Sequence, residues 1–149
     1  MDTDTRATLI RFLRAHGTLT IATVRADGWP QATAVSYASD ELTLYFAAGS
    51  DAQKIENIRR DARVSVTIQR DYDDWREVKG VSMAATAELL ADAHDARHAR
   101  QLLERKFARF AELGAADDFA GWTFVRLTPK VISLIDYSAG YGHKLQFNG

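Results

Sequence analysis

The sequence predicts an α+β domain built on an antiparallel β-sheet. Six or seven segments alternate apolar and polar residues with the period of a strand, and three segments have the spacing of an amphipathic helix. Turns of hairpin length join most of the strand segments, which excludes parallel neighbours and so favours an antiparallel sheet. With this many strands in 149 residues, closure into a small barrel is the simplest way to remove exposed strand edges.

Each predicted element follows from local periodicity and from the turn-forming residues at its ends. Asp27-Gly28 is the strongest hairpin signal in the chain. The predicted helices are one capped by Asp4 or Thr5 and ended by His16-Gly17, a short one over Ala52–Arg60, and a long one from Asp92 to Gly114. The predicted strands are Leu19–Val24, Gln31–Tyr37, Leu42–Ala48, Arg63–Gln69, Val78–Leu90, Trp122–Thr128 and Val131–Tyr137, and the tail from Ser138 has no periodicity.

Composition places the chain among single globular domains, spanning residues 1–149, with 46% hydrophobic and 26% charged residues. The absence of cysteine excludes disulfides, thiol nucleophiles and cysteine-ligated metals. A net charge of −1 argues against nucleic acid or an anionic membrane as partner. The acidic start of the chain and the lack of a long apolar run lead us to expect a soluble, cytoplasmic protein.

The segment from Leu44 to Val66 is the best candidate for chemistry. A strand ends at Gly49-Ser50-Asp51, and a short helix follows with Lys54 in its first turn. The free amides and the positive dipole end of a helix N-terminus attract an anion, so this break could bind a phosphate with help from Lys54. Alternatively, Ser50 and Gln53 form a capping box that satisfies the same amides internally.

One face of a predicted strand carries only small side chains. Ala32, Ala34 and Ser36 share that face, and Ala47 and Ala48 stand on the following strand. Such a patch would let a planar ligand approach the backbone closely. The alternative is that a helix packs tightly against it.

The order and spacing of these segments resemble the pyridoxamine 5′-phosphate oxidase-like flavoproteins. The resemblance spans about Leu19 to His143. It is carried by Thr20-Ile21-Ala22-Thr23-Val24, Asp27-Gly28-Trp29-Pro30, Ala34-Val35-Ser36-Tyr37, Leu44-Tyr45-Phe46-Ala47, the run from Lys54 to Ser65, Gly80-Val81-Ser82 and Ala87-Glu88-Leu89. The ending, Ile132 to Ser138 with Gly140-Tyr141-Gly142-His143, is similar to one small-protein branch of that family.

The resemblance implies a six-stranded antiparallel split β-barrel of Greek-key type with about three flanking helices. It also implies a homodimer with flavin mononucleotide (FMN), or a deazaflavin coenzyme, in the groove between the subunits. By this resemblance Lys54 holds the cofactor phosphate. As aromatic side chains, Trp75 and Tyr137 are candidates to pack on a planar ring, and the alternative is that they belong to the core. The expected cofactor-binding residues are Thr33, Ala34, Val35, Ser36, Ala47, Ala48, Gln53, Lys54 and Trp75.

The chain departs from the true oxidases at several positions. Ala52 stands where a serine is usual, and Ala32 and Tyr37 replace basic residues. No arginine follows Arg126, so a C-terminal basic substrate clamp is missing. We therefore expect an FMN- or deazaflavin-dependent oxidoreductase that acts on another small substrate and uses no catalytic triad. The alternatives are a non-catalytic module that stores or senses flavin, and an empty barrel that serves as a dimerisation unit.

The remaining clusters are weaker candidates. His94 and His98 have the i, i+4 spacing of a metal-binding pair, but no third ligand is evident. Asp71, Asp73 and Asp74 form an acidic loop without the spacing of a calcium site. His143 lies in the glycine-rich tail, where it could either reach a partner's site or be solvated. We expect no metal.

Overall fold

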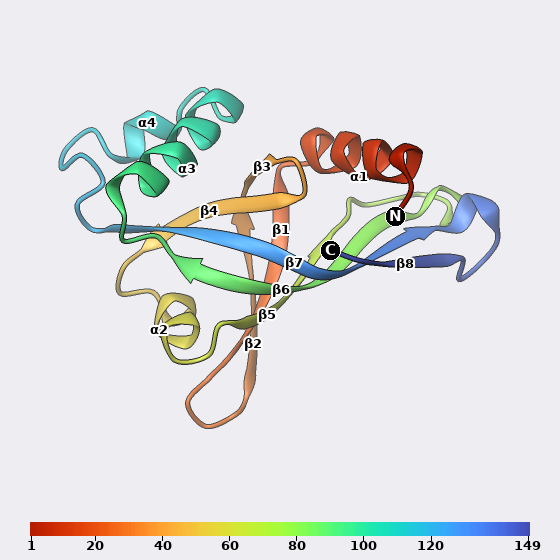
Figure 1. The fold of residues 1–149 in the computed structure, drawn as a ribbon, viewed down its shortest axis with the longest axis horizontal. Helices are drawn as coiled ribbons and strands as arrows, with labels where there is room; N and C mark the ends of the chain where they lie inside the picture. The colour runs from red at the N-terminus through yellow and green to blue at the C-terminus, as the bar shows by residue number, and fades with distance from the viewer.

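A computed structural model describes all 149 residues as one curled antiparallel sheet with helices at its rim (Figure 1). The helices are α1 (Thr3–Ala15), α2 (Gln53–Arg60), α3 (Ala93–Lys106) and α4 (Phe110–Leu113), with 3₁₀ turns η1 (Trp75–Glu77) and η2 (Tyr137–Ala139). The strands are β1 (Thr18–Val24), β2 (Pro30–Ser36), β3 (Ala38–Asp40), β4 (Thr43–Gly49), β5 (Arg63–Ile68), β6 (Lys79–Leu89), β7 (Trp122–Asp136) and β8 (Lys144–Asn148). None of the helices is long and apolar enough to span a membrane.

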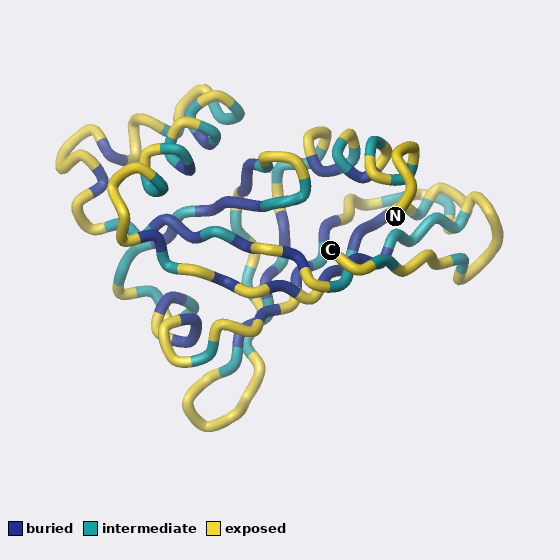
Figure 2. Tube along the Cα trace, in the orientation of Figure 1, coloured by how far each residue is buried: buried dark blue, intermediate teal, exposed yellow.

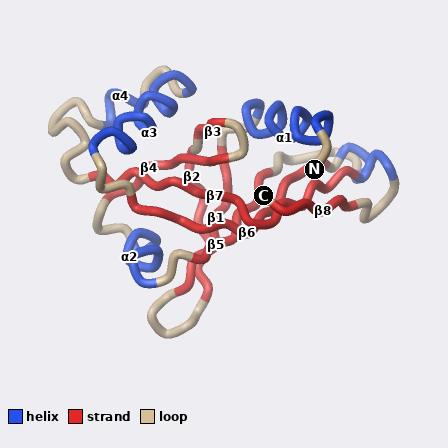
Figure 3. The backbone as a smooth tube through the Cα atoms, in the orientation of Figure 1, coloured by secondary structure: helices blue, strands red, loops and turns tan.

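The sheet confirms the predicted α+β class. Its strand order is β2-β1-β5-β6-β7-β4-β3, with β8 paired to β7, and every pairing is antiparallel. Figure 3 shows the strands gathered in the middle of the molecule, with the helices around them. The structure has eight strands rather than six, because a short β3 precedes β4 and the tail contributes β8. The Asp27-Gly28 hairpin forms as predicted, with β1 and β2 paired from Thr18↔Ser36 to Val24↔Pro30.

The two strands predicted on either side of Pro129 are one strand, β7. Because a proline has no N–H to donate to a neighbouring strand, the sequence predicts that the strand is interrupted at Pro129. The structure instead accommodates Pro129 at an irregularity in the β6–β7 pairing, where Ala84 is paired with Val131 and Ala85 with Pro129, so that Lys130 of β7 has no partner on β6. The N-terminal half of β7 pairs with β4, and its C-terminal half pairs with β8.

Three other predictions were wrong: the end of the long helix, the N-cap of the first helix, and the absence of regular structure in the tail. The long helix predicted to reach Gly114 stops at Lys106, with Phe107 as its C-cap, and the separate turn α4 follows. Asp2, rather than Asp4 or Thr5, caps α1 through the amide of Thr5. The tail beyond Ser138 was expected to be irregular, yet Lys144–Asn148 pairs with Val131–Ile135.

Two apolar clusters hold the sheet and helices together. Figure 2 marks the buried residues in dark blue, along the strands and on parts of the helices. The larger one fills the curl of the sheet and includes Leu9 and Leu13 of α1 and Ile55 and Ile58 of α2. The smaller one packs α3 against β4 and β7 through Leu103, with the region after α3 contributing further aromatic side chains. Burial of the α2 pair confirms the amphipathic pattern from which that helix was predicted.

Asn57 is a fully buried polar residue that ties α2 to the β1–β2 hairpin. Its amide nitrogen donates to Thr23 Oγ1 at 2.9 Å and to Gln31 Oε1 at 3.2 Å. Its amide oxygen accepts from Gln53 Nε2 at 2.8 Å. Because each polar atom of the Asn57 side chain is paired, the network fixes α2 against the hairpin without leaving a buried group unsatisfied.

The substitution Asn57→Ala should lower the free energy of unfolding by about 2–3 kcal/mol, because it leaves buried Thr23 without its donor and opens a small cavity. Urea denaturation measures this loss. The control Gln101→Ala, on the exposed face of α3, should stay within about 0.5 kcal/mol of the unaltered chain. Equal stability of the two variants would contradict the structural role of Asn57.

Candidate functional site

A groove of about 530 Å³ opens where β2, β4 and α2 meet the chain that follows α3. Such a volume is within the range of small-molecule sites in proteins. The lining residues are Ala34, Val35, Ser36, Ala47, Ala48, Gly49, Ala52, Lys54, Phe107, Arg109, Phe110, Leu113 and Trp122. Six of the nine residues expected to bind a cofactor are therefore brought together in one place.

The floor of the groove is made of small side chains. Ala34 and Ser36 lie on the exposed face of β2, and β2 is an edge strand with neither face fully covered. Ala47 and Ala48 come from β4, directly before Gly49. No helix packs over the exposed β2 face in this chain, so the alternative of close helix packing does not account for its small residues.

The opposite wall is aromatic, and the sequence did not predict it. Phe107, Phe110, Leu113 and Trp122 face the groove from the C-cap of α3, from α4 and from the first residue of β7. Phe107 and Phe110 were assigned to the core face of a continuous helix, because their spacing fits one. In the structure both rings are packed against the smaller apolar cluster, as that pattern predicts, and they also line the groove after α3 ends at Lys106.

The first turn of α2 forms one end of the groove and carries no side-chain cap. Its N-cap residue is Ala52, which has no polar atom to offer. The predicted capping box of Ser50 and Gln53 is wrong. The Ser50 hydroxyl is instead hydrogen-bonded to Thr123 Oγ1 at 2.8 Å, and the Gln53 amide donates to Asn57. The positive dipole end of α2 is therefore not offset by a side-chain acceptor.

Lys54 adds a positive charge to this end of the groove. It is half-buried, lines the groove beside Ala52, and takes part in no ion pair. The arginines at the other end of α2 are used within the chain: Arg59 pairs with Glu56, and Arg60 donates to the carbonyl of Val24. Lys54 is thus the one helix cation in α2 that remains available to a ligand.

Three predicted residues do not line the groove. Thr33 is not among the lining residues, although Val35 on the same face of β2 is, and the side chain of Gln53 is directed to Asn57. Trp75 lies in η1, where its ring meets Tyr141 edge-on with centroids 5.6 Å apart. Tyr137 packs on the same Tyr141 at 5.3 Å. The end of the molecule with η1 and η2 is well separated from α2 and α4 (Figure 1).

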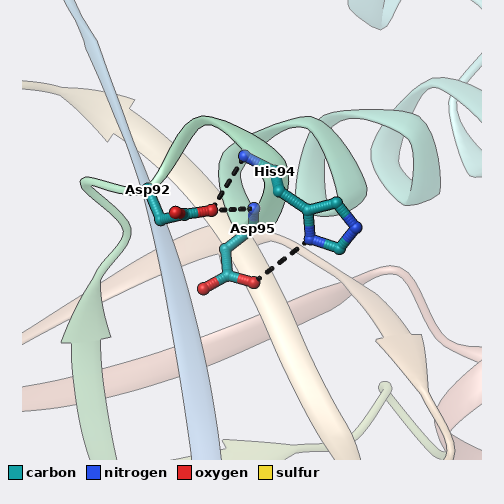
Figure 4. Close-up of side chains that lie close together, drawn as sticks. All are labelled: Asp92, His94 and Asp95. Carbon is teal, nitrogen blue, oxygen red and sulfur yellow. Dashed lines mark hydrogen bonds and ion pairs between the residues drawn. The ribbon is translucent and has the colours of Figure 1, made fainter.

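The histidine and aspartate clusters have structural roles. Asp92 caps α3 by accepting from the amides of His94 and Asp95, and the His94 ring lies 3.7 Å from the Asp95 carboxylate (Figure 4). His98 does not join His94; its Nε2 lies 3.1 Å from Asp40 Oδ2 instead. Capping accounts for this exposed arrangement.

The family model described as pyridoxamine 5′-phosphate oxidase matches residues 6–136. No curated protein sequence matches the chain. Among solved structures, a heme-binding protein from Mycobacterium smegmatis matches with a TM-score of 0.78 and 20% identity, covering 96% of this chain and 57% of that one. A conserved hypothetical protein from Mycobacterium tuberculosis matches with a TM-score of 0.79 and 23% identity, covering 100% and 93%.

The heme storage protein HutZ from Vibrio cholerae matches with a TM-score of 0.66 and 19% identity, covering 93% of this chain and 91% of that one. At these identities the structural likenesses show a shared fold. The first of these structures is also much longer than this chain, which spans little more than half of it. The family match is the stronger finding because it covers most of the sequence, and on that ground the chain belongs to the pyridoxamine 5′-phosphate oxidase family.

Proposed function

We propose that this chain binds flavin mononucleotide in the groove and serves as an FMN-dependent oxidoreductase acting on a small substrate. The single observation that carries the proposal is Lys54, half-buried and without an ion-pair partner, at the uncapped N-terminus of α2 where the groove ends. Backbone amides at a helix start and a lysine ammonium are the usual partners of a phosphate.

The residues present fit such a cofactor. Its phosphate would meet Lys54 and the first turn of α2, and its planar ring would lie on the small floor of Ala34 and Ala48. Phe110 and Trp122 would cover the ring and exclude water from it. A bound flavin supplies hydride or electron transfer, so the chain itself needs only to bind, orient and shield the reacting groups.

A homodimer is part of this proposal. The edge strand β2 is half-exposed on one face and exposed on the other, and Trp29 at the hairpin tip is 72% exposed. Aromatic side chains of this kind are enriched where subunits meet. Trp75, which is 51% exposed and lies away from the groove of its own chain, would then be free to meet the groove of a second copy.

Pyridoxine phosphate is not the substrate we propose. The groove offers Arg109 as its only further cation, and that arginine is paired with Glu112 at 3.0 Å. The phosphate of such a substrate, bound beside FMN, would therefore find no unpaired cation in the groove. The aromatic wall favours instead an apolar or aromatic substrate with little charge.

A second candidate is non-catalytic binding of a planar ligand, flavin, deazaflavin or heme, for storage or sensing. Solved proteins of the same fold that bind or store heme favour it. The groove, however, contains no histidine, tyrosine, cysteine or methionine that could ligate heme iron from this chain. Steady-state reduction of the FMN-loaded protein by a nicotinamide or deazaflavin donor separates the two: turnover supports the enzyme, and binding without turnover supports storage or sensing.

The substitution Lys54→Ala should weaken FMN binding about 10- to 150-fold, which corresponds to the loss of about 1.5–3 kcal/mol for a charge-assisted hydrogen bond. Quenching of flavin fluorescence measures the dissociation constant. Lys130→Ala, which removes an exposed lysine of β7, is the matched control and should bind as the unaltered chain does. Unchanged affinity in Lys54→Ala would remove Lys54 from the site.

The substitution Ala34→Ile should weaken FMN binding about tenfold or more, because it fills the floor of the groove. Folding should be little affected, since Ala34 is exposed on a strand and a β-branched residue is favourable there. Ala32→Ile makes the same change on the same face of β2 outside the groove. If both variants lose affinity equally, the ligand does not lie over Ala34.

A further inference from the structure

A separate cavity of about 230 Å³ lies where the C-terminal ends of α1 and α3 converge on β3. In Figure 1 these two helices flank β3 at the rim of the sheet, away from α2. The lining residues are Arg14, Ala38, Ser39, Leu102, Arg105 and Lys106, none of which lines the groove. Three of the six are cations and none is an acid.

No carboxylate of the chain neutralises these three cations. Arg14, Arg105 and Lys106 take part in no ion pair, and the nearest acids on β3 and its turn are engaged elsewhere. Asp40 is held by His98 and Glu41 by Arg6. The C-terminal dipoles of two helices amount to about −0.5 charge each, so they offset roughly one of the three positive charges. About two positive charges remain around the cavity in a protein whose net charge is −1.

Lys106 is fixed in place beside the cavity. Its ammonium donates to the carbonyls of Leu13 and His16 and lies 4.2 Å from the centroid of the Tyr37 ring. These contacts hold Nζ in one position, as a built site requires. Partial burial removes water from the ammonium and lowers the pKa of Lys106 to about 8, and no anionic group of the chain compensates for the lost hydration.

We propose that this cavity binds a tetrahedral oxyanion, either free phosphate or the phosphoryl group of a small metabolite. The guanidinium groups of Arg14 and Arg105 supply forked donors, Lys106 supplies a fixed point charge, and the Ser39 hydroxyl supplies a further donor. A volume of 230 Å³ holds a phosphate with several waters, each of which occupies about 30 Å³. The site is independent of the flavin proposed for the groove.

The proposal is tested by calorimetric titration with inorganic phosphate, pyrophosphate and glucose 6-phosphate at constant ionic strength. Saturable binding of at least one of them is expected, and the double variant Arg14→Gln/Arg105→Gln should weaken it about tenfold or more. Both arginines are exposed, so this variant should fold. Arg97→Gln/Arg59→Gln removes the same charge from other exposed positions and should change affinity less than about twofold.

Tighter binding of glucose 6-phosphate would identify a phosphoryl-bearing ligand, and tighter binding of the inorganic anions would identify a free oxyanion. A second readout is the NMR titration of the Lys106 ε-methylene group. A bound anion should raise the pKa of Lys106 above about 8. The Tyr37 ring and the carbonyls of Leu13 and His16 contact this ammonium, and Arg14 and Arg105 line the same cavity. The double variant lacks both arginines, so it should lose the anion-induced rise. No saturable binding, or equal weakening in both double variants, would overturn the proposal.

Discussion

The fold depends on the uninterrupted pairing of β7. This strand runs through Pro129, pairs with β6 along most of its length, and on its other edge holds β4 with one half and β8 with the other. A proline would end most central strands, but the extra unpaired residue of β7, Lys130, opposite Ala84 and Ala85 of β6 accommodates it and bends the ladder. The resulting curl encloses the main core and sets the end of β4 beside the start of β7.

The candidate site follows from that arrangement. Because Gly49 is paired with Trp122, the loop after β4 lies against the first residues of β7. The Ser50 hydroxyl is bound there by Thr123, and Ala52 is left as the uncapped N-cap of α2. Asn57 then fixes α2 to the hairpin that carries the floor of the groove. One pairing register thus creates a helix N-terminus that lacks a side-chain acceptor and faces a groove.

Local periodicity predicted the strands, the Asp27-Gly28 hairpin and α2, because these elements are determined by neighbouring residues. It could not predict the hydrogen-bond partner of the Ser50 hydroxyl, because that partner, Thr123, is 73 residues away in the sequence. The same limit applies to the aromatic wall. Phe107 and Phe110 fit a continuous helix by spacing, and only the C-cap at Phe107 reveals that the helix ends before them. Asn57 was missed because a polar residue beside arginines resembles a solvated helix face until its buried partners are known.

The small floor and Lys54 could be predicted because strand alternation and the Gly49-Ser50-Asp51 break are local signals, to which the resemblance to a family added support. The central claim is that this end of the groove recognises the phosphate of a planar ligand. The most direct measurement compares the affinity of the unaltered chain for FMN with its affinity for riboflavin, which lacks the phosphate. The account predicts that FMN binds about tenfold tighter or more. Equal affinity for the two flavins, or binding of neither, would contradict it.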